Sequence, residues 1–259
     1  MPSTRENTIM TAQTYLERGL ALHDFKRVAL ATDAVRTENG WDTGHDAKGV
    51  RDTSAGFSGQ WSIRVNKWVV QGNEAVALSD LYTNGGNRVC TSHYFKVSGD
   101  KIKELRITFR VGQMPGNGIG VAAPPPASNK PAGNKLVGIV DGFLKGLEKG
   151  SLASAKLGPD VMITENGEIK ALAKEAALKY WQEAWLGKLT KVTATRWLVE
   201  GPDVVVLYQA DMREGRPFWI TQYFRVYDGL IRETWANFGS GPTAAEKAEA
   251  ARTKSSKRR

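Results

Sequence analysis

The chain has 259 residues, of which 41% are apolar, and a formal net charge of +9. This length allows one large domain or two of average size, and the composition suits a folded globular protein. No apolar run approaches the roughly 18–20 residues of a membrane span, and the first residues do not resemble a secretory signal. A single cysteine, Cys90, excludes an internal disulfide and a multi-thiolate metal site. We expect a cytoplasmic protein with Cys90 in its core.

Much of the positive charge lies at the C-terminal end. Residues 244–259 carry six basic side chains against two acidic ones. A basic tail can bind nucleic acid, but here no aromatic residues accompany the charges to form a stacking surface. We therefore expect a solubilising tail and no nucleic-acid partner.

The first predicted element is a helix from Gln13 to Ala31, where apolar residues recur at roughly helical spacing with a break near Asp24. Thr37-Glu38-Asn39-Gly40 then predicts a short strand that runs into a turn, because Asn-Gly favours positive backbone angles. Residues 41–61 are rich in Gly and Asp and predict a loose connection. Alternating apolar and polar residues predict four strands, at residues 61–71, 75–83, 89–98 and 102–110.

The second half of the chain repeats this order. Residues 136–147 predict a helix that ends at Gly150, and Ile169–Trp185 predicts another helix. Four further strands are predicted, at residues 189–200, 203–212, 217–227 and 230–238. Helices followed by a run of hairpin-linked antiparallel strands indicate an α+β fold.

Four short segments of the first half recur in the second. Thr37–Gly40 matches Thr164–Gly167 at an offset of 127 residues. Three more pairs match at an offset of 129 residues: Lys67–Gly72 with Arg196–Gly201, Tyr94–Val97 with Tyr223–Val226, and Ile102–Glu104 with Ile231–Glu233. Ordered matches at a nearly constant offset indicate a tandem duplication. The Gly- and Pro-rich stretch between the copies predicts a linker. The expected division is a first module at 1–113, a linker at 114–134, a second module at 135–240 and a basic tail at 241–259.

This order of elements resembles the NTF2-like superfamily. Asp33–Gly40 and Val97–Glu104 look like the segments that begin and close the sheet in its SnoaL-like members. The resemblance implies a curved antiparallel sheet wrapped around N-terminal helices to form an open cone. It also implies two classes of function: dehydratases, isomerases, epoxide hydrolases, cyclases and lyases that work without a cofactor, or transport factors and ligand-binding modules without catalysis.

Strand alternation places His93, Phe95 and Val97 on one face, which we expect to line the cone, with Gln222 in the place of His93 in the second copy. A pocket histidine with a pKa near neutrality is a ready general base, and resembling dehydratases abstract protons with a His–Asp pair. Asp24 is the expected partner. The competing interpretation is a core histidine and a helix-end aspartate. Arg106 would hold an anion or an enolate oxygen on the concave face, or be a surface arginine on the convex one.

Eight tryptophans favour a pocket lined by aromatic rings, which suits flat apolar ligands. The residues that we expect to contact a substrate are Tyr15, Trp61, Tyr82, Tyr180, Trp185, Tyr208, Gln222, Trp235 and Asn237. The sequence has no P-loop and no Gly-x-Gly-x-x-Gly after a strand, and its three histidines lack zinc-site spacing. We therefore expect no cofactor and no metal.

Two hypotheses of function follow. The first is a cofactor-independent lyase or isomerase that acts on an aromatic or polyketide-like small molecule, as do the superfamily's lyases that deformylate lignin-derived diaryl compounds. The second is a non-catalytic ligand-binding or scaffolding protein. The convex sheet faces, with Tyr94 and Tyr223, are the surfaces by which the resembling fold pairs, so we expect a homo-oligomer or an internal pseudo-dimer.

Overall fold

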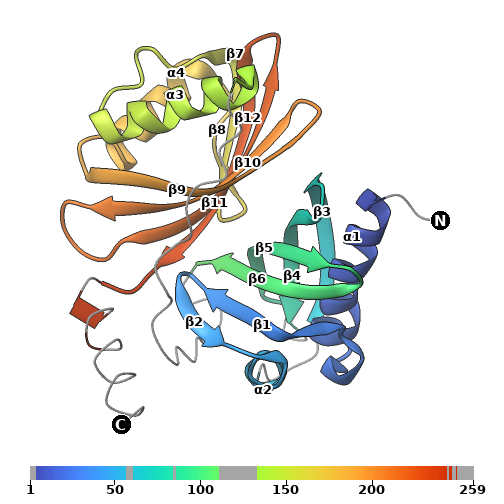
Figure 1. Ribbon diagram of the computed structural model, residues 1–259. Coiled ribbons are helices and arrows are strands. Elements are labelled where there is room, and N and C mark those ends of the chain that lie inside the picture. Colours follow the sequence, from blue (N-terminus) through green and yellow to red (C-terminus); the bar gives the residue numbers. More distant parts are fainter. Residues whose placement is uncertain are drawn as a thin grey trace. The chain divides into compact units, whose positions relative to one another are not determined.

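The computed structural model describes residues 4–56, 61–83, 86–110, 133–243, 245–246 and 249. The chain forms two compact units, one of residues 1–125 with 241–259 and one of residues 126–240. We call residues 4–110 module 1 and residues 133–240 module 2, and describe each by itself (Figure 1). Nearly all of the predicted linker and most of the predicted tail lie outside the described residues. No helix among the described residues is both long and apolar enough to cross a membrane.

Module 1 combines helical segments at its start with six strands. Its helical segments are α1 (Thr4–Thr14), the π-helix η1 (Tyr15–Ala21), the 3-10 turn η2 (Phe25–Arg27) and α2 (Ala47–Ala55). Its strands are β1 (Leu30–Glu38), β2 (Trp41–Gly44), β3 (Trp61–Gln71), β4 (Glu74–Thr83), β5 (Arg88–Ser98) and β6 (Lys101–Phe109).

Module 2 has the same order of elements. Its helices are α3 (Lys135–Lys149) and α4 (Lys174–Ala184). Its strands are β7 (Leu157–Glu165), β8 (Glu168–Ala171), β9 (Leu189–Glu200), β10 (Asp203–Met212), β11 (Phe218–Tyr227) and β12 (Leu230–Ser240).

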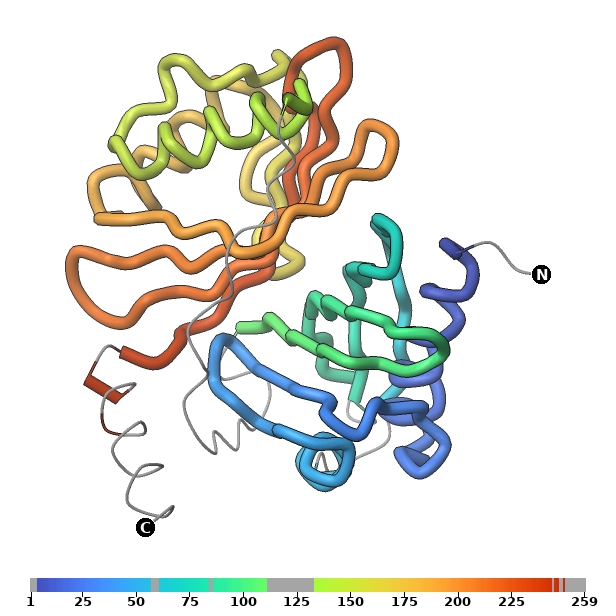
Figure 2. The backbone as a smooth tube through the Cα atoms, viewed as in Figure 1, coloured from blue at the N-terminus to red at the C-terminus, as the bar shows by residue number. Residues whose placement is uncertain are grey.

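Each module has one six-stranded sheet, and the two sheets share one topology. The strand orders are β2-β1-β6-β5-β4-β3 and β8-β7-β12-β11-β10-β9. The first long strand lies parallel to the last, β1 to β6 and β7 to β12, and every other pairing is antiparallel. Figure 2 shows that the strands of each sheet are bent rather than flat. A twisted and bent sheet has a concave face, which the helices of its own module cover.

The core of each module lies between its helices and the concave face of its sheet. In module 1 the ring of Tyr15 packs 5.9 Å from that of Phe95 on β5. In module 2 the ring of Phe143 on α3 packs 5.4 Å from that of Phe224 on β11. Burying an aromatic side chain of this size contributes roughly 1.5–3 kcal/mol to folding.

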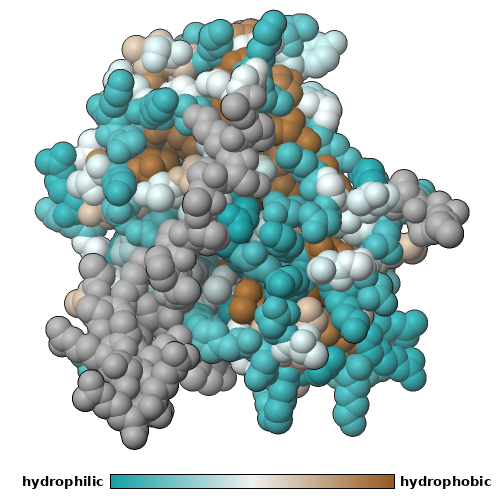
Figure 3. Space-filling view, in the orientation of Figure 1, coloured by the Kyte–Doolittle hydropathy of each residue, from teal (hydrophilic) through white to brown (hydrophobic). Residues whose placement is uncertain are grey.

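The face seen in Figure 3 is largely hydrophilic, with hydrophobic side chains visible beside α3.

The eight long strands expected from alternation are confirmed, each to within two residues at either end. The duplicated α+β architecture is confirmed as well. Strand alternation and turn residues are local signals, so they predict strands without knowledge of the tertiary structure.

Three predictions about the helical regions were wrong: the boundaries of two helices and the absence of a third helix. The first helix begins at Thr4 rather than Gln13, because α1 buries only Thr8, Thr11 and Ala12 and so has no apolar stripe to detect. Residues 41–61 contain β2 and α2 rather than a loose connection, and the side chain of Asp46 caps α2 by accepting from the Gly49 amide at 2.6 Å. The helix expected from Ile169 begins only at Lys174, after β8.

Candidate active site

The repeated Thr-Glu-Asn-Gly motif places one glutamate at the same point of each module. Glu38 ends β1 and Glu165 ends β7, and both are about 5% exposed. The asparagine that follows has a positive φ, 46° at Asn39 and 47° at Asn166. Its side-chain oxygen accepts from the amide of the last strand, Phe109 at 3.1 Å in module 1 and Phe238 at 3.0 Å in module 2. The motif therefore fixes each glutamate beside the last strand, with its side chain directed into the cone.

In module 1 this glutamate is held by an arginine. The Arg36 guanidinium is fully buried and donates to Glu38, to the Thr43 hydroxyl at 2.8 Å and to the Tyr15 hydroxyl at 3.2 Å. The Tyr15 hydroxyl in turn lies 3.1 Å from that of Ser54. A buried carboxylate in such a network has its charge balanced by the guanidinium.

His93 points into the core of module 1, as strand alternation predicted. Its Nδ1 lies 3.3 Å from the Ser79 hydroxyl and 3.4 Å from that of Thr91, and its ring stacks 6.1 Å from that of Phe95. Burial, with a smaller contribution from the charge of Arg36, lowers the pKa of His93 to about 3. The expected near-neutral pKa is therefore wrong, because the ring is only 1% exposed and desolvation disfavours its charged form.

The other two expected catalytic residues lie elsewhere. Asp24 forms an ion pair with Arg27 at 3.0 Å on η2, where its side chain is 35% exposed, so the structure does not bring it to His93. Arg106 pairs with Glu104 and lies over the Tyr94 ring at 5.5 Å. Leu105 beside it is part of the core, so alternation places Arg106 on the convex face, the second of its two expected positions.

The expected substrate-contacting residues separate by module and face. Tyr15 and Trp61 are core residues of module 1. Tyr82, Trp235 and Asn237 alternate with core residues of their strands and so belong to the convex faces. The remaining four, Tyr180, Trp185, Tyr208 and Gln222, come together around Glu165 in module 2.

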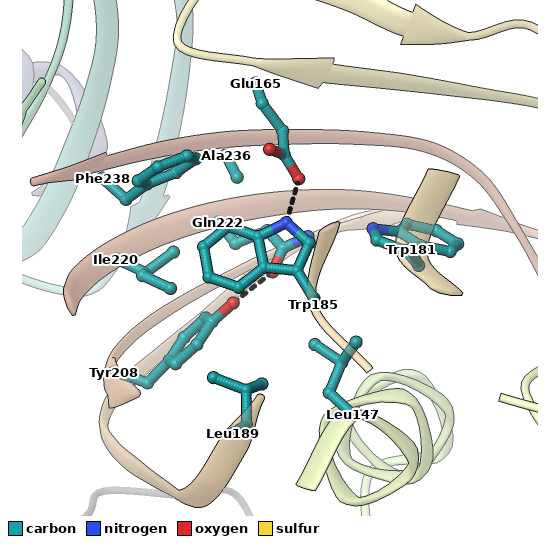
Figure 4. A pocket seen from close by; sticks show the side chains of 10 residues that line it. All are labelled: Leu147, Glu165, Trp181, Trp185, Leu189, Tyr208, Ile220, Gln222, Ala236 and Phe238. Atoms are coloured by element: carbon teal, nitrogen blue, oxygen red, sulfur yellow. Dashed lines mark hydrogen bonds between the residues drawn. The ribbon is translucent and has the colours of Figure 1, made fainter. Parts of the chain in front are cut away.

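These residues surround a pocket in the cone of module 2 (Figure 4). Its lining is mostly apolar, with one carboxylate, one amide and one hydroxyl, as small-molecule sites commonly are. The lining residues are Leu147, Glu165, Trp181, Trp185, Leu189, Tyr208, Ile220, Gln222, Ala236 and Phe238.

Glu165 is the carboxylate of this pocket, and both of its oxygens accept hydrogen bonds. The Tyr180 hydroxyl donates to Oε2 at 2.5 Å, and the Trp185 indole nitrogen donates to Oε1 at 3.0 Å. Burial raises the pKa of Glu165, although the two hydrogen bonds and the charge of Lys170 work against this rise. A carboxyl group with a raised pKa, held in a fixed orientation, is suited to transfer a proton.

A second polar chain crosses the pocket wall. The Tyr208 hydroxyl donates to Gln222 Oε1 at 2.6 Å, and Gln222 Nε2 donates to the Thr234 hydroxyl at 2.6 Å. Burial and, to a lesser degree, the charge of Glu165 raise the pKa of Tyr208, so its hydroxyl stays protonated and remains a donor. Gln222 thus has the position predicted for it, which is equivalent to that of His93 in module 1.

The pocket is narrow. The hollow has about 310 Å³ of empty space when its open mouth is included, but its cavity volume is only about 10 Å³. That cavity has room for roughly one water molecule. A larger ligand must therefore displace one of the lining side chains.

The two cones differ most in what surrounds the shared glutamate. By position in the repeat, Ile163 replaces Arg36 and Tyr208 replaces Ser79, and Phe143 packs on Phe224 as Tyr15 packs on Phe95. Module 1 therefore has a polar, ion-paired interior, whereas module 2 has an aromatic interior in which Glu165 accepts from two neutral donors, Tyr180 and Trp185.

Glu165 was absent from the residues expected at the site. Its motif predicts a short strand that runs into a turn, and so indicates the fold rather than the site. The signal that distinguishes the copies is Ile163, since an apolar residue two positions before a buried glutamate leaves it without the neighbour that balances Glu38.

Comparisons with known proteins match parts of the chain. A family model described as a domain of unknown function, DUF8021, matches residues 1–109. No curated protein matches the chain. An NTF2-like protein of unknown function from Burkholderia xenovorans is 16% identical, with a TM-score of 0.36, over 42% of this chain and 87% of that one.

Two further solved structures are similar over one module. An LEH-like epoxide hydrolase of M. tuberculosis is 18% identical, with a TM-score of 0.38, over 43% of this chain and 89% of that one. A designed protein with a curved β-sheet is 18% identical, with a TM-score of 0.37, over 43% of this chain and 89% of that one.

The assignment of the fold follows from the topology of the chain itself. Each module has initial helices, a short hairpin, a parallel pairing of its first and last long strands, and a bent sheet around a helix-covered core. The chain is a tandem of two modules with the NTF2-like fold.

Proposed function

We propose that module 2 is an isomerase or lyase for a small aromatic molecule and that Glu165 transfers the proton. One observation carries the proposal: a buried carboxyl group with a raised pKa is oriented by Tyr180 and Trp185 at the wall of an aromatic pocket. Perturbed carboxyl groups in apolar pockets are common general acids and bases.

The proposed chemistry begins with removal of a proton from a carbon next to a carbonyl group. The Glu165 carboxylate takes the proton, and the electron pair of the C–H bond moves toward the carbonyl oxygen to form an enolate. The Tyr208 hydroxyl turns from Gln222 Oε1, to which it donates in the unliganded pocket, and donates to that oxygen as its negative charge develops. Return of the proton to another carbon completes an isomerisation, whereas expulsion of a neighbouring group completes an elimination.

Module 1 supports this chemistry less well. Its equivalent carboxylate, Glu38, is ion-paired with Arg36 in the core. The pKa of His93 is about 3, so this ring is a weak base whose conjugate acid barely forms near neutral pH. The proton-transfer role expected of His93 is therefore proposed for Glu165 instead.

The test is a thermal-shift screen of aromatic carbonyl compounds on the full chain, followed by mass analysis of each hit after incubation. Glu165→Gln should bind the hits but convert them at least about 100-fold more slowly, since a general acid or base typically contributes 10²–10⁴-fold. His93→Gln is the matched control, because glutamine is the residue at this position in module 2, and it should convert hits at the wild-type rate. The opposite pattern would assign the reaction to module 1 and overturn the proposal.

A second candidate, a non-catalytic ligand-binding protein, is favoured by the hydrogen bonds that already occupy both oxygens of Glu165. The same screen separates the two candidates. A compound that stabilises the protein and returns unchanged supports binding alone, whereas a new mass that depends on Glu165 supports the enzyme.

A further inference from the structure

Trp185 places a flat aromatic ring inside the pocket of module 2. Its indole lies edge-on to Phe238, with ring centroids 5.1 Å apart, and edge-on to Phe218 at 5.7 Å. Phe218 and Phe238 pack edge-on to each other at 5.5 Å. The three rings form a cluster in which edge-to-face contacts favour a planar partner.

The same indole also provides the donor for Glu165. Its nitrogen donates to Glu165 Oε1 at 3.0 Å, and Figure 4 shows the ring lying between that carboxylate and the Tyr208 side chain. The indole therefore fills the pocket with a flat apolar ring and also provides one N–H group that donates to the carboxylate.

The pocket has little space beside the Trp185 indole. The cavity volume is about 10 Å³, room for roughly one water molecule. A planar molecule that reaches Glu165 Oε1 from inside the cone therefore needs the space that the indole fills.

The backbone around Trp185 suits such a displacement. Trp185 is the residue that follows α4, and its φ and ψ of −127° and −42° are outside the helical range. A tight turn follows, with Lys188 N donating to the Trp185 carbonyl at 3.1 Å and Gly187 at a φ of 76°. A side chain at a helix end next to a glycine turn can change rotamer without disrupting the helix.

We infer that Trp185 occupies the place of the natural ligand, and that this ligand is a planar aromatic molecule with an O–H or N–H group that donates to Glu165 once the indole has moved aside. The inference rests on the site of the proposed function but not on its chemistry. It narrows the substrate class to phenol-like or indole-like compounds.

The test compares two pairs of probes by calorimetry on the full chain: 2-naphthol with naphthalene, and indole with 1-methylindole. The first member of each pair has the donor and the second lacks it. In wild type the ligand's hydrogen bond replaces that of the indole, so the donor gives little net gain. Trp185→Phe removes the competing N–H, so its preference for the donor compound should rise about tenfold, as expected for a hydrogen bond to a charged group. Trp68→Phe, which changes a ring in module 1, should leave the preference unchanged.

A second measurement follows the indole itself. The Trp185 indole N–H resonance, assigned by its loss in Trp185→Phe, should shift when 2-naphthol saturates the wild-type protein. Equal affinity of Trp185→Phe for donor and non-donor probes, no binding of either donor probe, or saturation without a shift of that resonance would each overturn the inference. Donor-dependent binding without any converted compound would leave the inference standing and overturn only the proposed enzyme.

Discussion

Glu38 and Glu165 end equivalent strands of the two modules, yet the residue two positions earlier on the same strand face is Arg36 in one and Ile163 in the other. Both carboxyl groups are about 5% exposed. Glu38 is paired with a guanidinium, whereas Glu165 accepts from a phenol and an indole. The residue that precedes the duplicated motif thus contributes to the difference between a carboxylate paired with a guanidinium and one whose proton affinity is raised by burial.

Replacing Arg36 with the residue of the other module tests this contrast. Arg36→Ile should destabilise module 1 by about 3–5 kcal/mol, because it leaves the Glu38 charge buried without its partner. Denaturant unfolding measures the loss. The double variant Arg36→Ile/Glu38→Leu should recover much of it, since the unpaired charge is then removed, and a double variant as unstable as the single one would contradict this explanation.

The pH dependence of stability should report the raised pKa of Glu165. Its folded pKa lies above the ordinary value of 4.5, so its contribution to stability is complete below pH 4.5 and is lost as the pH rises through the folded pKa. Wild type should therefore lose stability relative to Glu165→Gln across that window. Unfolding free energies of both proteins at a series of pH values from 4 to 8 measure the difference, and parallel curves would show that burial does not perturb this group.

His93 should have the opposite dependence. Its pKa of about 3 lies below the ordinary 6.5, so its contribution is complete above pH 6.5 and is lost as the pH falls toward 3. Between pH 6.5 and pH 5, wild type should lose about 2 kcal/mol more than His93→Gln. The ring resonances of His93 should not titrate over the same range, and a midpoint near 6 in that titration would show that the ring is solvated.

The turn asparagines allow a matched pair of variants. Asn166→Ala should cost about 1–3 kcal/mol, because alanine is strained at a φ of 47° and cannot accept from the Phe238 amide. Asn166→Gly should cost less, since glycine tolerates that φ. Because Phe238 lines the pocket, Asn166→Ala should also weaken ligand binding, whereas Asn39→Ala should destabilise module 1 and leave binding unchanged. Equal binding by Asn166→Ala and wild type would show that the turn does not position the pocket.

The sequence predicted the sheets better than the helices. Alternation located β3–β6 and β9–β12, but β1 and β7 are longer than the short strand expected at each Thr-Glu-Asn-Gly, and β1 begins at Leu30, within the helix expected to reach Ala31. The helices α1 and α2 bury so few apolar residues that periodicity gave no signal for them. The π-helix η1 begins at Tyr15, whose ring packs on that of Phe95 in β5, and π-helices are too rare to be expected from a local pattern. Pairing through the convex faces, with Tyr94 and Tyr223, stays a prediction.

The sequence predicted only part of the candidate site, and the missing part has a physical explanation. Aromatic residues at Tyr180, Trp185 and Tyr208 were recognisable from composition, and Gln222 from strand alternation. Glu165 was not, because its pKa depends on burial and on donors that lie 15 and 20 residues further along the chain. A pattern of residues records which groups are present, whereas the desolvation that makes one of them reactive exists only in the folded module.

The parallel pairing of the first and last strands also affects how the protein is made. β1 cannot complete its hydrogen bonds until β6 has been synthesised, so the sheet of module 1 closes late in its own translation. β6 nevertheless leaves the ribosome before any residue of α3, and β1 therefore meets its own partner before the equivalent strand β12 exists. The linear order of the duplication thus favours correct pairing in two sheets of the same topology over exchange of strands, a characteristic misfolding route of tandem repeats.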